Sequence, residues 1–599
     1  MYLERISDPA DVKALDAQAL PVLCDELRAA IISSSAAVGG HVGANLGVVE
    51  LTVALHRVFD SPADKLVFDV SHQTYAHKML TGRAAAFLDP ARYGEVSGFT
   101  NPRESAHDHF AMGHTSTSVG LALGLAHARD LASEHHDVVA VIGDGSLSGG
   151  LAFEGLDNAA ELGSGLIIVV NDNEWSISRN HGGIYRNLAE LRATSGTAPC
   201  NLFRAMGLDY RYLEHGNDVL AVERALRELR GADHPVVLHV HTTKGLGFAP
   251  ARGDEESWHH VGPFDPATGE KLGGGRASGG IVATLPATYA DLTGDFLLGR
   301  MRADRDVVAL SSATPYMMGF TPGRRAAAGR QFVDVGIAEE HAVTFAAGLA
   351  KAGAKPVYGV YGTFLQRAYD ELWHDACLNG APVTILVFGA SAFGTTDATH
   401  LGFFDVPMLG AMPGLTYLAP TCVEEYLDML AWSIDWQGGP VAIRVPGNGM
   451  SSDPTMPLAG GAGYADGHAC TVREGSRVAV LALGSAFGLG RQTCVLLAKH
   501  GIDATLVNPR EARTPDPKLM ARLPQSHSVV ITIEDAVAQG GFGEHVARRL
   551  GPSGVRVRCY GLPCAFPDRY DPNELLAECG MTAEGIAVDA LELLGIEEA

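Results

Sequence analysis

Short apolar runs alternate with alanine-rich, helix-forming stretches along most of the chain. The runs are nearly continuous in Val, Ile and Leu rather than alternating with polar residues, as in KLVFDV, VVAVIGDG, PVTILVFG and SVVITIED. Strands of this kind are buried on both faces, which is typical of parallel sheets covered by helices. The pattern therefore predicts an α/β fold with doubly wound, mostly parallel sheets.

Two stretches rich in glycine or proline interrupt this rhythm. They are GEKLGGGRASGG at residues 269–280 and GNGMSSDPTMPLAGGAG at residues 447–463. Such compositions favour linkers, and 599 residues are too many for a single hydrophobic core. We therefore expect three α/β domains, at residues 1–268, 284–447 and 472–599.

Composition narrows the class of protein. The net charge of −24 argues against a nucleic-acid partner, because phosphate backbones are bound by clustered Lys and Arg. Nine scattered cysteines without a CxxC motif favour reduced thiols over a disulfide framework or a zinc site. The N-terminus is charged where a signal peptide is apolar, and no continuous apolar run approaches the roughly 20 residues of a membrane helix. We therefore expect a soluble, cytoplasmic protein with no membrane partner.

One buried strand ends in a charged residue. The run VVAVI is followed by Gly143-Asp144-Gly145, and the next run, LIIVV, by the sequence NDN, which ends at Asn173. A β-α-β unit brings the carboxyl ends of both strands side by side, where doubly wound sheets bind ligands. One carboxylate and one amide oxygen suit Mg²⁺, and the glycines and following helix N-terminus suit a diphosphate. Alone, GDG could equally be a tight turn, but paired with NDN it predicts a metal–diphosphate site.

These motifs also resemble those of a known family. GDG followed by NDN is similar to the thiamine-diphosphate motif of the transketolase superfamily, and flanking blocks narrow the resemblance to 1-deoxy-D-xylulose-5-phosphate synthases. The blocks are IISSSAAVGGHVGANLGVVELTVALH, SHQTYAHKMLTGR, GHTSTSVGLALGLA, NDNEWSIS, VGIAEEHAVTFAAGLA and TFLQRAYDELWHD. They occur in the family's order over about residues 30–450, with a weaker match to the end. The resemblance implies three transketolase-type domains and a homodimer whose interface the third domain provides.

The resemblance assigns roles around two cofactors, thiamine diphosphate and Mg²⁺. It implies metal ligands at Asp144, Asn173 and the backbone carbonyl of Trp175. A carboxyl group that gives a proton to the pyrimidine ring activates this cofactor, and Glu339 matches the family's glutamate for that step. In isolation, Glu339 and its neighbour Glu340 would indicate an exposed acidic turn. Ser116 and Lys244 would bind the diphosphate, Ile337 would support the bent conformation of thiamine diphosphate, and Phe364 would stack on the pyrimidine ring. The other cofactor-binding residues that the resemblance implies are Arg367, His72, His114, Gly143, Gly145 and Ser146.

Histidines occupy the expected substrate side. A lone histidine is more often structural than catalytic, but five of them match family positions in Gly- or Ser-rich loops: His41, His72, His114, His259 and His400. Because imidazole exchanges protons near neutral pH, the expected catalytic residues, besides Glu339, are His41, His259, His400 and Tyr361. The expected substrate-binding residues are His41, Tyr361, His400 and Arg444. Four histidines are expected to be structural: His77, His260, His341 and His374.

The sequence departs from the family pattern at residues that bind the phosphate of the aldehyde acceptor in the family. Gly389 stands at the position of a family arginine, and Thr396 replaces a family aspartate, with Asp397 one step on. Glycine does not replace a guanidinium–phosphate contact. A second family arginine is expected to survive as Arg444, with Arg179, Arg324 and Arg325 as alternatives. The segment 179–207 is also shorter than in the family, and ATPYMMGFTPG replaces a more polar stretch.

The activity implied by the resemblance is a decarboxylating carboligation. Pyruvate and glyceraldehyde 3-phosphate would give CO₂ and 1-deoxy-D-xylulose 5-phosphate, a precursor of isoprenoids, thiamine and pyridoxal. The departures leave an alternative open: a paralog that joins a 2-oxoacid to a different aldehyde, phosphorylated or not, in a specialised pathway. Less favoured alternatives are an ordinary transketolase, a cofactor-binding protein without turnover and the first component of an oxoacid dehydrogenase complex.

Overall fold

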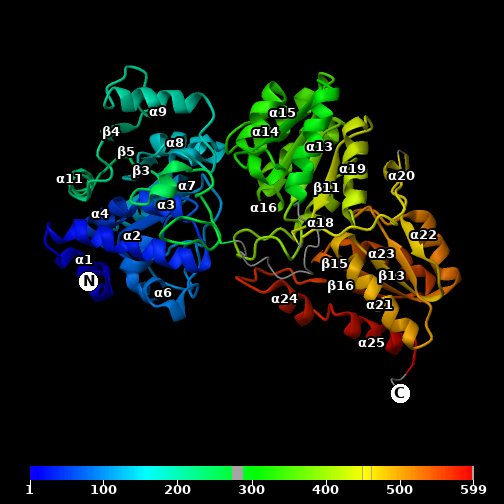
Figure 1. Ribbon diagram of the computed structural model, residues 1–599. Helices are drawn as coiled ribbons and strands as arrows, with labels where there is room; N and C mark the ends of the chain where they lie inside the picture. Colours follow the sequence, from blue (N-terminus) through cyan, green and yellow to red (C-terminus); the bar gives the residue numbers. More distant parts are fainter. Residues whose placement is uncertain (273–287, 448, 461, 597–599) are drawn as a thin grey trace. The chain divides into compact units, whose positions relative to one another are not determined.

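The computed structural model describes residues 1–272, 288–447, 449–460 and 462–596. The chain divides into two compact units: residues 1–275 with 336–338, and residues 276–335 with 339–599. In Figure 1 the first unit is coloured mostly blue to green and the second mostly green to red. The first predicted linker, residues 269–280, lies outside the described residues from position 273 onward.

The first unit is built on a five-stranded sheet in the order β1-β2-β3-β5-β4, with every pair parallel. Its strands are β1 (Lys65–Phe68), β2 (Val138–Gly143), β3 (Ile167–Asp172), β4 (Asp209–Leu213) and β5 (Val236–His241). Successive residues face opposite sides of the sheet: Val139 and Val141 belong to one apolar cluster, Ala140 and Ile142 to another. The sheet is therefore buried on both faces, which explains why its strands are continuously apolar.

Helices cover both faces of this first sheet (Figure 1). One apolar cluster includes residues of α2 (Ala19–Val38), α4 (Val49–Val58) and α11 (Val219–Leu229). The opposite cluster includes residues of α7 (Ser118–Ala132), α8 (Gly150–Leu162), α9 (Gly183–Ala193) and α10 (Leu202–Ala205). Shorter helices complete the unit: α1 (Pro9–Ala14), α3 (Val42–Gly47), α5 (Tyr75–Lys78), α6 (Ala85–Leu88) and α12 (Ala249–Gly253).

The second unit contains two sheets, of which the first is entirely parallel in the order β10-β11-β9-β8-β6-β7. Its strands are β6 (Val307–Ser311), β7 (Phe332–Asp334), β8 (Lys355–Tyr361), β9 (Thr384–Phe388), β10 (Thr416–Leu418) and β11 (Val441–Val445). Its helices are α13 (Tyr289–Ala303), α14 (Pro322–Ala328), α15 (Glu339–Lys351), α16 (Gly362–Leu365), α17 (Tyr369–Glu371), α18 (Asp405–Gly410) and α19 (Val423–Asp435).

The last sheet has the order β12-β14-β13-β15-β16, in which only the β12–β14 pair is antiparallel. Its strands are β12 (Cys470–Arg473), β13 (Arg477–Ala482), β14 (Thr505–Asn508), β15 (His527–Val537) and β16 (Arg556–Leu562). Its helices are α21 (Phe487–Lys499), α22 (Pro517–Arg522), α23 (Phe542–Leu550), α24 (Pro572–Glu578) and α25 (Ala583–Leu593). The short helix α20 (Ala462–Ala465) contacts α19 instead, since the ring of Tyr464 lies 5.5 Å from that of Trp432. The three sheets confirm the predicted fold class of doubly wound, mostly parallel α/β structure.

One apolar core serves both sheets of the second unit. Ile385 and Val387 of β9 share a cluster with Ala479 and Leu481 of β13. This common core explains why the second and third predicted domains form a single compact unit. Each sheet falls within one predicted domain, except that β12 begins at Cys470, before residue 472. The domain boundaries themselves stay predictions.

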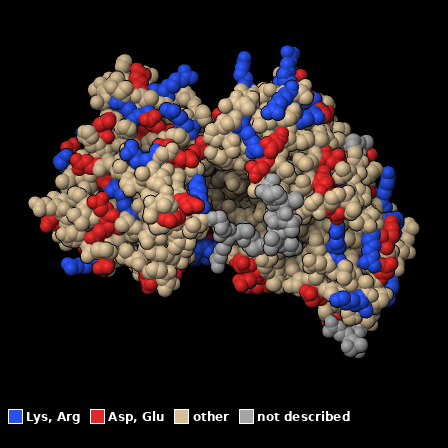
Figure 2. Space-filling view, viewed as in Figure 1, with Lys and Arg blue, Asp and Glu red and all other residues tan. Residues whose placement is uncertain are grey.

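Three further features of the described residues are the surface charges, the cysteines and the length of the apolar helices. On the face shown in Figure 2, the described Lys and Arg side chains are scattered among Asp and Glu and form no large basic patch. All nine cysteines are free thiols. No helix within the described residues combines the length and apolar character needed to cross a bilayer.

Candidate functional site

Asp144 and Asn173 lie at the same edge of the first sheet. β2 and β3 are parallel neighbours in which Gly143 lies opposite Asn171, so Asp144 and Asn173 follow adjacent strand ends. Asp144 is only 1% exposed and accepts a 2.7 Å hydrogen bond from Asn180 Nδ2. Burial, reinforced by neighbouring Asp172, raises the pKa of Asp144 well above its ordinary value. A buried carboxylate in this situation is stabilised by a cation, so its surroundings fit a bound Mg²⁺.

The metal ligands implied by the sequence would include only one carboxylate. Asn173 Oδ1 accepts a 3.1 Å hydrogen bond from the backbone N–H of Trp175, which fixes the turn that carries the third expected ligand. Within the described residues, no group of three or more His, Cys, Asp or Glu is arranged to hold a metal. The expected ligand set has a single carboxylate, so it would not appear as such a group. Its carboxylate, amide and backbone carbonyl oxygens are hard ligands suited to Mg²⁺.

Glycines shape a narrow backbone cradle beside Asp144. A Cβ at Gly145 would lie 2.6 Å from Ser176 Cβ, whereas a Cβ at Gly143 would meet nothing within 4 Å. A Cβ at Gly149 would lie 2.2 Å from Ser116 Oγ. The turn is therefore closed on one side and open in front of the strand end, as a bound diphosphate requires.

Ser116 is tied to this turn through its side chain and its backbone. Its Oγ donates a 2.8 Å hydrogen bond to the carbonyl of Ser146, and its φ is +72°. Asp69, at the end of β1, accepts hydrogen bonds from the backbone N–H groups of Ser116 and Ser118 at 2.8 and 3.0 Å. His114, two residues before Ser116, is partly buried. These contacts hold the start of α7 against the turn that follows β2.

Lys244 supplies a buried positive charge near the same edge. Its side chain follows β5, is 4% exposed, and donates a 2.7 Å hydrogen bond from Nζ to the carbonyl of Ser176. Burial lowers the pKa of Lys244 to about 8, although the carboxylate of Asp144 opposes this effect. An ammonium group destabilised by burial gains from a neighbouring anion, so its position fits the predicted diphosphate contact.

Three histidines of the first unit gather around a fourth, His41. Its ring centroid lies 5.1 Å from that of His72, 5.7 Å from that of His259 and 4.7 Å from that of His260. Asn45 Nδ2 donates to the carbonyls of both His41 and His72, at 2.6 and 2.7 Å. Burial lowers the pKa of His259 and of His260, so both imidazoles are neutral at pH 7. His260 was expected to be structural, and only the fold reveals that it belongs to this group.

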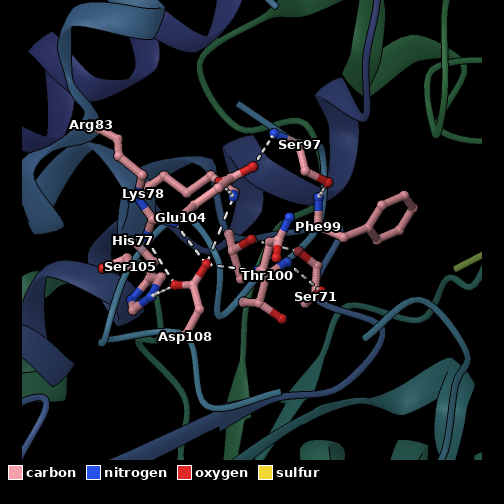
Figure 3. Close-up of polar contacts among 12 residues, drawn as sticks. Ser71, His77, Lys78, Arg83, Ser97, Phe99, Thr100, Glu104, Ser105 and Asp108 are labelled. Atoms are coloured by element: carbon pink, nitrogen blue, oxygen red, sulfur yellow. Dashed lines mark hydrogen bonds and ion pairs between the residues drawn. The ribbon is translucent and has the colours of Figure 1, made fainter. Parts of the chain in front are cut away.

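A buried ionic network organises the segment that follows His72 (Figure 3). Arg83 donates two hydrogen bonds to the Asp108 carboxylate at 2.7 and 2.8 Å, and His77 Nε2 lies 2.9 Å from the same carboxylate. Lys78 Nζ donates to Glu104 Oε2 at 2.6 Å. Burial would raise the pKa of Asp108, but Arg83 and His77 outweigh it and hold that pKa well below its usual range. His77 is therefore part of a structural network.

This network positions residues 97–108 beside the histidines. Backbone N–H groups of Ser97 and Asn101 donate to Glu104 and Asp108 at 2.7 and 2.8 Å. The backbone N–H of Thr100 donates a hydrogen bond to Ser71 Oγ (Figure 3). The two atoms are 2.8 Å apart. The ring of Phe99 consequently lies 5.6 Å from that of His41. The network thus adds an apolar wall to the histidine group, which the sequence motifs did not predict.

The shortened segment 179–207 packs against the metal-site edge of the first sheet. Asn180 contacts Asp144 as described, and Tyr185 Oη donates a 3.1 Å hydrogen bond to the carbonyl of Gly145. Arg192, on α9, pairs with Asp172. Burial would raise the pKa of Asp172, but hydrogen bonds and charges of His239 and Arg192 lower it to about 2. Asn180, Tyr185 and Arg192 carried no motif in the sequence, so their roles became apparent only from their contacts.

Residues 336–338 group with the first unit although the chain around them belongs to the second. The backbone N–H of Ile337 donates a 3.1 Å hydrogen bond to Ser148 Oγ, which also donates to the carbonyl of Gly145 at 3.0 Å. Ile337 is therefore connected to the turn that follows Asp144. This position is compatible with the predicted contact between Ile337 and the cofactor.

Glu339 begins α15 and is 3% exposed. Its Oε2 is buried and accepts no hydrogen bond from any described residue. The Nη1 atom of Arg367 lies 3.8 Å away, at ion-pair rather than hydrogen-bond distance. Burial raises the pKa of Glu339 to about 7, although Arg367 opposes this effect. A carboxyl group with a high pKa and an unsatisfied oxygen fits a partner with which it can share a proton, such as the ring nitrogen of an aminopyrimidine.

Three of the expected residues of the second unit lie together at the carboxyl end of its parallel sheet. Tyr361 ends β8, and its ring centroid is 5.8 Å from that of Phe364, which is 5.6 Å from that of His400. Gly389 directly follows β9, and a Cβ there would lie 3.5 Å from Tyr361 Cδ1. A side chain at position 389 would therefore project toward Tyr361, and this chain has none.

Arg444 requires a correction, because the structure does not support the prediction that it binds phosphate. Its side chain is 2% exposed, and its Nε donates a 2.7 Å hydrogen bond to Asp405 Oδ2. Its Nη1 donates to Asp535 Oδ1, and its Nη2 donates to the backbone carbonyl of Asp535 at 3.2 Å. Asp405 lies on α18 and Asp535 on β15, so this guanidinium joins the two sheets of the second unit. Arg444 is a structural residue.

Of the three alternatives to this arginine, Arg324 and Arg179 have carboxylate partners. Arg324 donates to Asp295 at 2.6 Å and lies 3.5 Å from Asp291. Arg179 is 72% exposed and lies 3.8 Å from Glu174. Arg325 lies over the ring of Tyr316, at 5.8 Å. None of these observations identifies a phosphate site.

Three family profiles match successive parts of the chain. The profile of 1-deoxy-D-xylulose-5-phosphate synthase matches residues 3–199, that of the transketolase pyrimidine-binding domain residues 286–449, and that of the transketolase C-terminal domain residues 467–586. Together with the fold and the site, these matches define a transketolase-type enzyme.

Relatives identify the family within this class. A 1-deoxy-D-xylulose-5-phosphate synthase of Pelotomaculum thermopropionicum is 38% identical over 634 residues, covering 98% of this chain and 96% of the relative. 1-Deoxy-D-xylulose-5-phosphate synthase 2 of Geobacter sulfurreducens is 40% identical over 626 residues, covering 98% of both chains. The solved transketolase of Leishmania mexicana aligns with 18% identity and a TM-score of 0.44 over 98% of both chains. The chain belongs to the 1-deoxy-D-xylulose-5-phosphate synthase family.

The structural role of Arg444 predicts a large loss of stability in Arg444→Met. The substitution leaves the carboxylates of Asp405 and Asp535 buried without their cation, which costs about 3–5 kcal/mol. Urea denaturation followed by circular dichroism measures the loss. Arg549→Met, on the exposed side of α23, should change the free energy of unfolding by only about 0.5 kcal/mol or less. An Arg444→Met variant as stable as wild type, with weakened binding of phosphorylated aldehydes alone, would restore the phosphate role.

The raised pKa of Glu339 predicts a pH-dependent stability in the absence of cofactor. The carboxyl group ionises near 4.5 in the unfolded chain but near 7 in the folded one, so folding loses stability as pH rises through this interval. Glu339→Gln cannot ionise. Its free energy of unfolding should therefore exceed that of wild type by an amount that grows above pH 4.5 and levels off above pH 7, on the order of 3 kcal/mol.

Urea denaturation at pH 5, 6, 7 and 8 measures this difference. Glu340→Gln is the matched control, because it removes the adjacent, less buried carboxyl group. A difference between Glu339→Gln and wild type that stays constant with pH would contradict the raised pKa.

Proposed function

We propose that this chain is a 1-deoxy-D-xylulose-5-phosphate synthase. It joins pyruvate and glyceraldehyde 3-phosphate to give 1-deoxy-D-xylulose 5-phosphate and CO₂, with thiamine diphosphate and Mg²⁺ as cofactors. The observation that carries the proposal is a buried, unsatisfied acid–base group, Glu339, in a family member that retains the buried carboxylate Asp144 at the strand edge. The names of its relatives supply the substrates.

The residues present fit these cofactors. Asp144, Asn173 and the carbonyl of Trp175 would hold the metal, and Ser116, Lys244 and the cradle around Gly145 the diphosphate. Phe364 and Ile337 would support the rings. When bound, thiamine diphosphate supplies the carbanion chemistry that decarboxylates a 2-oxoacid and passes the remaining two-carbon unit to an aldehyde.

Glu339 and the histidines handle protons in this proposal. With a pKa of about 7, the carboxyl group of Glu339 can hold a proton at Oε2 and share it with a ring nitrogen. Because burial lowers its pKa, His259 is a neutral, weak base that readily gives up any proton it accepts, and His41 lies beside it. In the second unit, His400 and Tyr361 would orient the acceptor and exchange its hydroxyl proton. Phe99 excludes water beside His41.

The cell compartment and assembly are part of the same proposal. The nine free thiols favour a reducing compartment, so we place the enzyme in the cytoplasm. Its resemblance to the family favours a homodimer that acts on small molecules. The charges scattered over the face shown in Figure 2 give no support for a nucleic-acid partner.

The relatives do not favour the second candidate, the paralog with a different acceptor, but two positions of the second unit bear on it. Position 389 is glycine, and Arg444 is consumed by Asp405 and Asp535. The second unit therefore lacks both arginines that the resemblance assigned to the acceptor's phosphate. This candidate keeps the 2-oxoacid donor and the cofactor chemistry and changes only the aldehyde.

An NMR time course with ¹³C-labelled pyruvate tests both candidates. The enzyme is incubated with thiamine diphosphate and Mg²⁺, in parallel with glyceraldehyde 3-phosphate, unphosphorylated glyceraldehyde or no acceptor. The proposal predicts labelled 1-deoxy-D-xylulose 5-phosphate, formed fastest with the phosphorylated aldehyde. Consumption of pyruvate without this product would favour the second candidate. No consumption with any acceptor, with cofactor bound, would overturn the carboligase function itself.

A further inference from the structure

Glu104 and Phe99 belong to one irregular segment of the first unit, residues 97–108. This segment has turns and bends but no helix or strand, so its backbone N–H groups need other partners. Glu104 Oε1 accepts a 2.7 Å hydrogen bond from the backbone N–H of Ser97. Ser97 Oγ in turn accepts a 3.1 Å hydrogen bond from the backbone N–H of Phe99. Glu104 therefore fixes the backbone at Phe99 through a single intermediate residue.

Two buried cations hold the Glu104 carboxylate in place (Figure 3). Lys78 Nζ donates a 2.6 Å hydrogen bond to Glu104 Oε2, and Arg83 Nη1 donates one of 3.3 Å to the same oxygen. Arg83 also pairs with Asp108, so two cations face two carboxylates in this network. Because these charges balance, Glu104 is stabilised in the position from which it holds Ser97.

The far end of this series of contacts is His41. The buried ring of Phe99 lies edge-to-face with the His41 imidazole, at a centroid distance of 5.6 Å and an angle of 67°. A Cβ at Gly98 would lie 3.7 Å from Tyr75 Oη, which accepts a 3.1 Å hydrogen bond from the backbone N–H of His41. The segment thus contacts the ring of His41 directly and its backbone through Tyr75.

We propose that Glu104 is a positioning residue, which holds Phe99 against His41 and thereby fixes the orientation of this imidazole for substrate. The inference rests on the proposed function, in which His41 contacts substrate. A ring packed edge-to-face is restricted in its rotation, and a reacting group held in one orientation needs no reorientation when substrate binds. Glu104 acts through Ser97 and Phe99 rather than by contact with substrate.

Steady-state kinetics of Glu104→Ala tests the proposal. With pyruvate and glyceraldehyde 3-phosphate, kcat/KM should fall roughly 10- to 100-fold, because His41 loses its fixed orientation. Glu104→Gln keeps an oxygen for the N–H of Ser97 and should recover most of the loss. The dissociation constant of thiamine diphosphate, measured by calorimetry, should stay within about twofold of wild type. This second readout separates the positioning of His41 from a general loosening of the unit.

Combination with Phe99→Leu shows whether Glu104 acts through Phe99. Phe99→Leu removes the ring and changes no charge. The double variant should lose no more than the larger of the two single losses, since both changes remove the same contact. Ser97→Ala removes only the acceptor for the N–H of Phe99 and should lower kcat/KM in the same direction. This variant keeps the network's charges, so it provides the test if Glu104→Ala does not fold.

Glu228→Ala is the matched control, because it removes a glutamate from an exposed ion pair of the same unit, with Arg211 at 3.8 Å. Its kcat/KM should equal that of wild type, and circular dichroism of each variant verifies folding. An unchanged kcat/KM in folded Glu104→Ala, losses that multiply in the double variant, or an equal loss of cofactor affinity would each overturn the positioning role alone. If wild type itself forms no product, the proposed function fails and this inference with it.

Discussion

A carboxylate buried at the end of a parallel strand is costly unless a cation meets it, and Asp144 is placed in that position. The other features of the first unit's site follow from this constraint. β3 lies next to β2 and brings Asn173 to the same edge. Asn180 donates a hydrogen bond to Asp144, and Lys244 donates one to the carbonyl of Ser176. A metal–diphosphate pair would relieve the unfavourable burial of both Asp144 and Lys244. The fold is therefore arranged around charges that the protein alone does not neutralise.

The second unit also contains buried charges, but these neutralise one another within the protein. Arg444 is buried between Asp405 and Asp535, so its positive charge is neutralised by carboxylates of both sheets. A buried guanidinium that already pairs with two carboxylates is not available to bind a substrate phosphate. Removing it would leave two buried charges unpaired. With Gly389, this pairing leaves the second unit without an available arginine at either position that the resemblance implies for the acceptor's phosphate. In the proposed function, cofactor and acceptor are therefore recognised by different residues of this chain.

Local sequence patterns predicted the fold class and the adjacency of two strand ends, whereas the roles of the expected cofactor residues stay predictions. Continuous apolar runs predicted parallel sheets, and GDG with NDN predicted adjacent strand ends, which the β2–β3 pairing confirms. Contacts between residues distant in sequence could not be predicted in this way. The residues around Arg444 do not indicate that it pairs with Asp535, 91 residues away. Those around Arg83 do not indicate that it pairs with Asp108. For the same reason, the shared core of the second unit and the approach of His260 to His41 became apparent only in the structure.

The most direct test of the central claim is a calorimetric titration of the enzyme with thiamine diphosphate. The account predicts saturable binding to wild type in the presence of Mg²⁺, weakened roughly 100-fold or more by chelating the metal or by Asp144→Asn. Asp157→Asn, on the exposed side of α8, should bind as wild type does. Binding of equal affinity in Asp144→Asn, or without Mg²⁺, would contradict the claim that a buried carboxylate holds the cofactor through a metal.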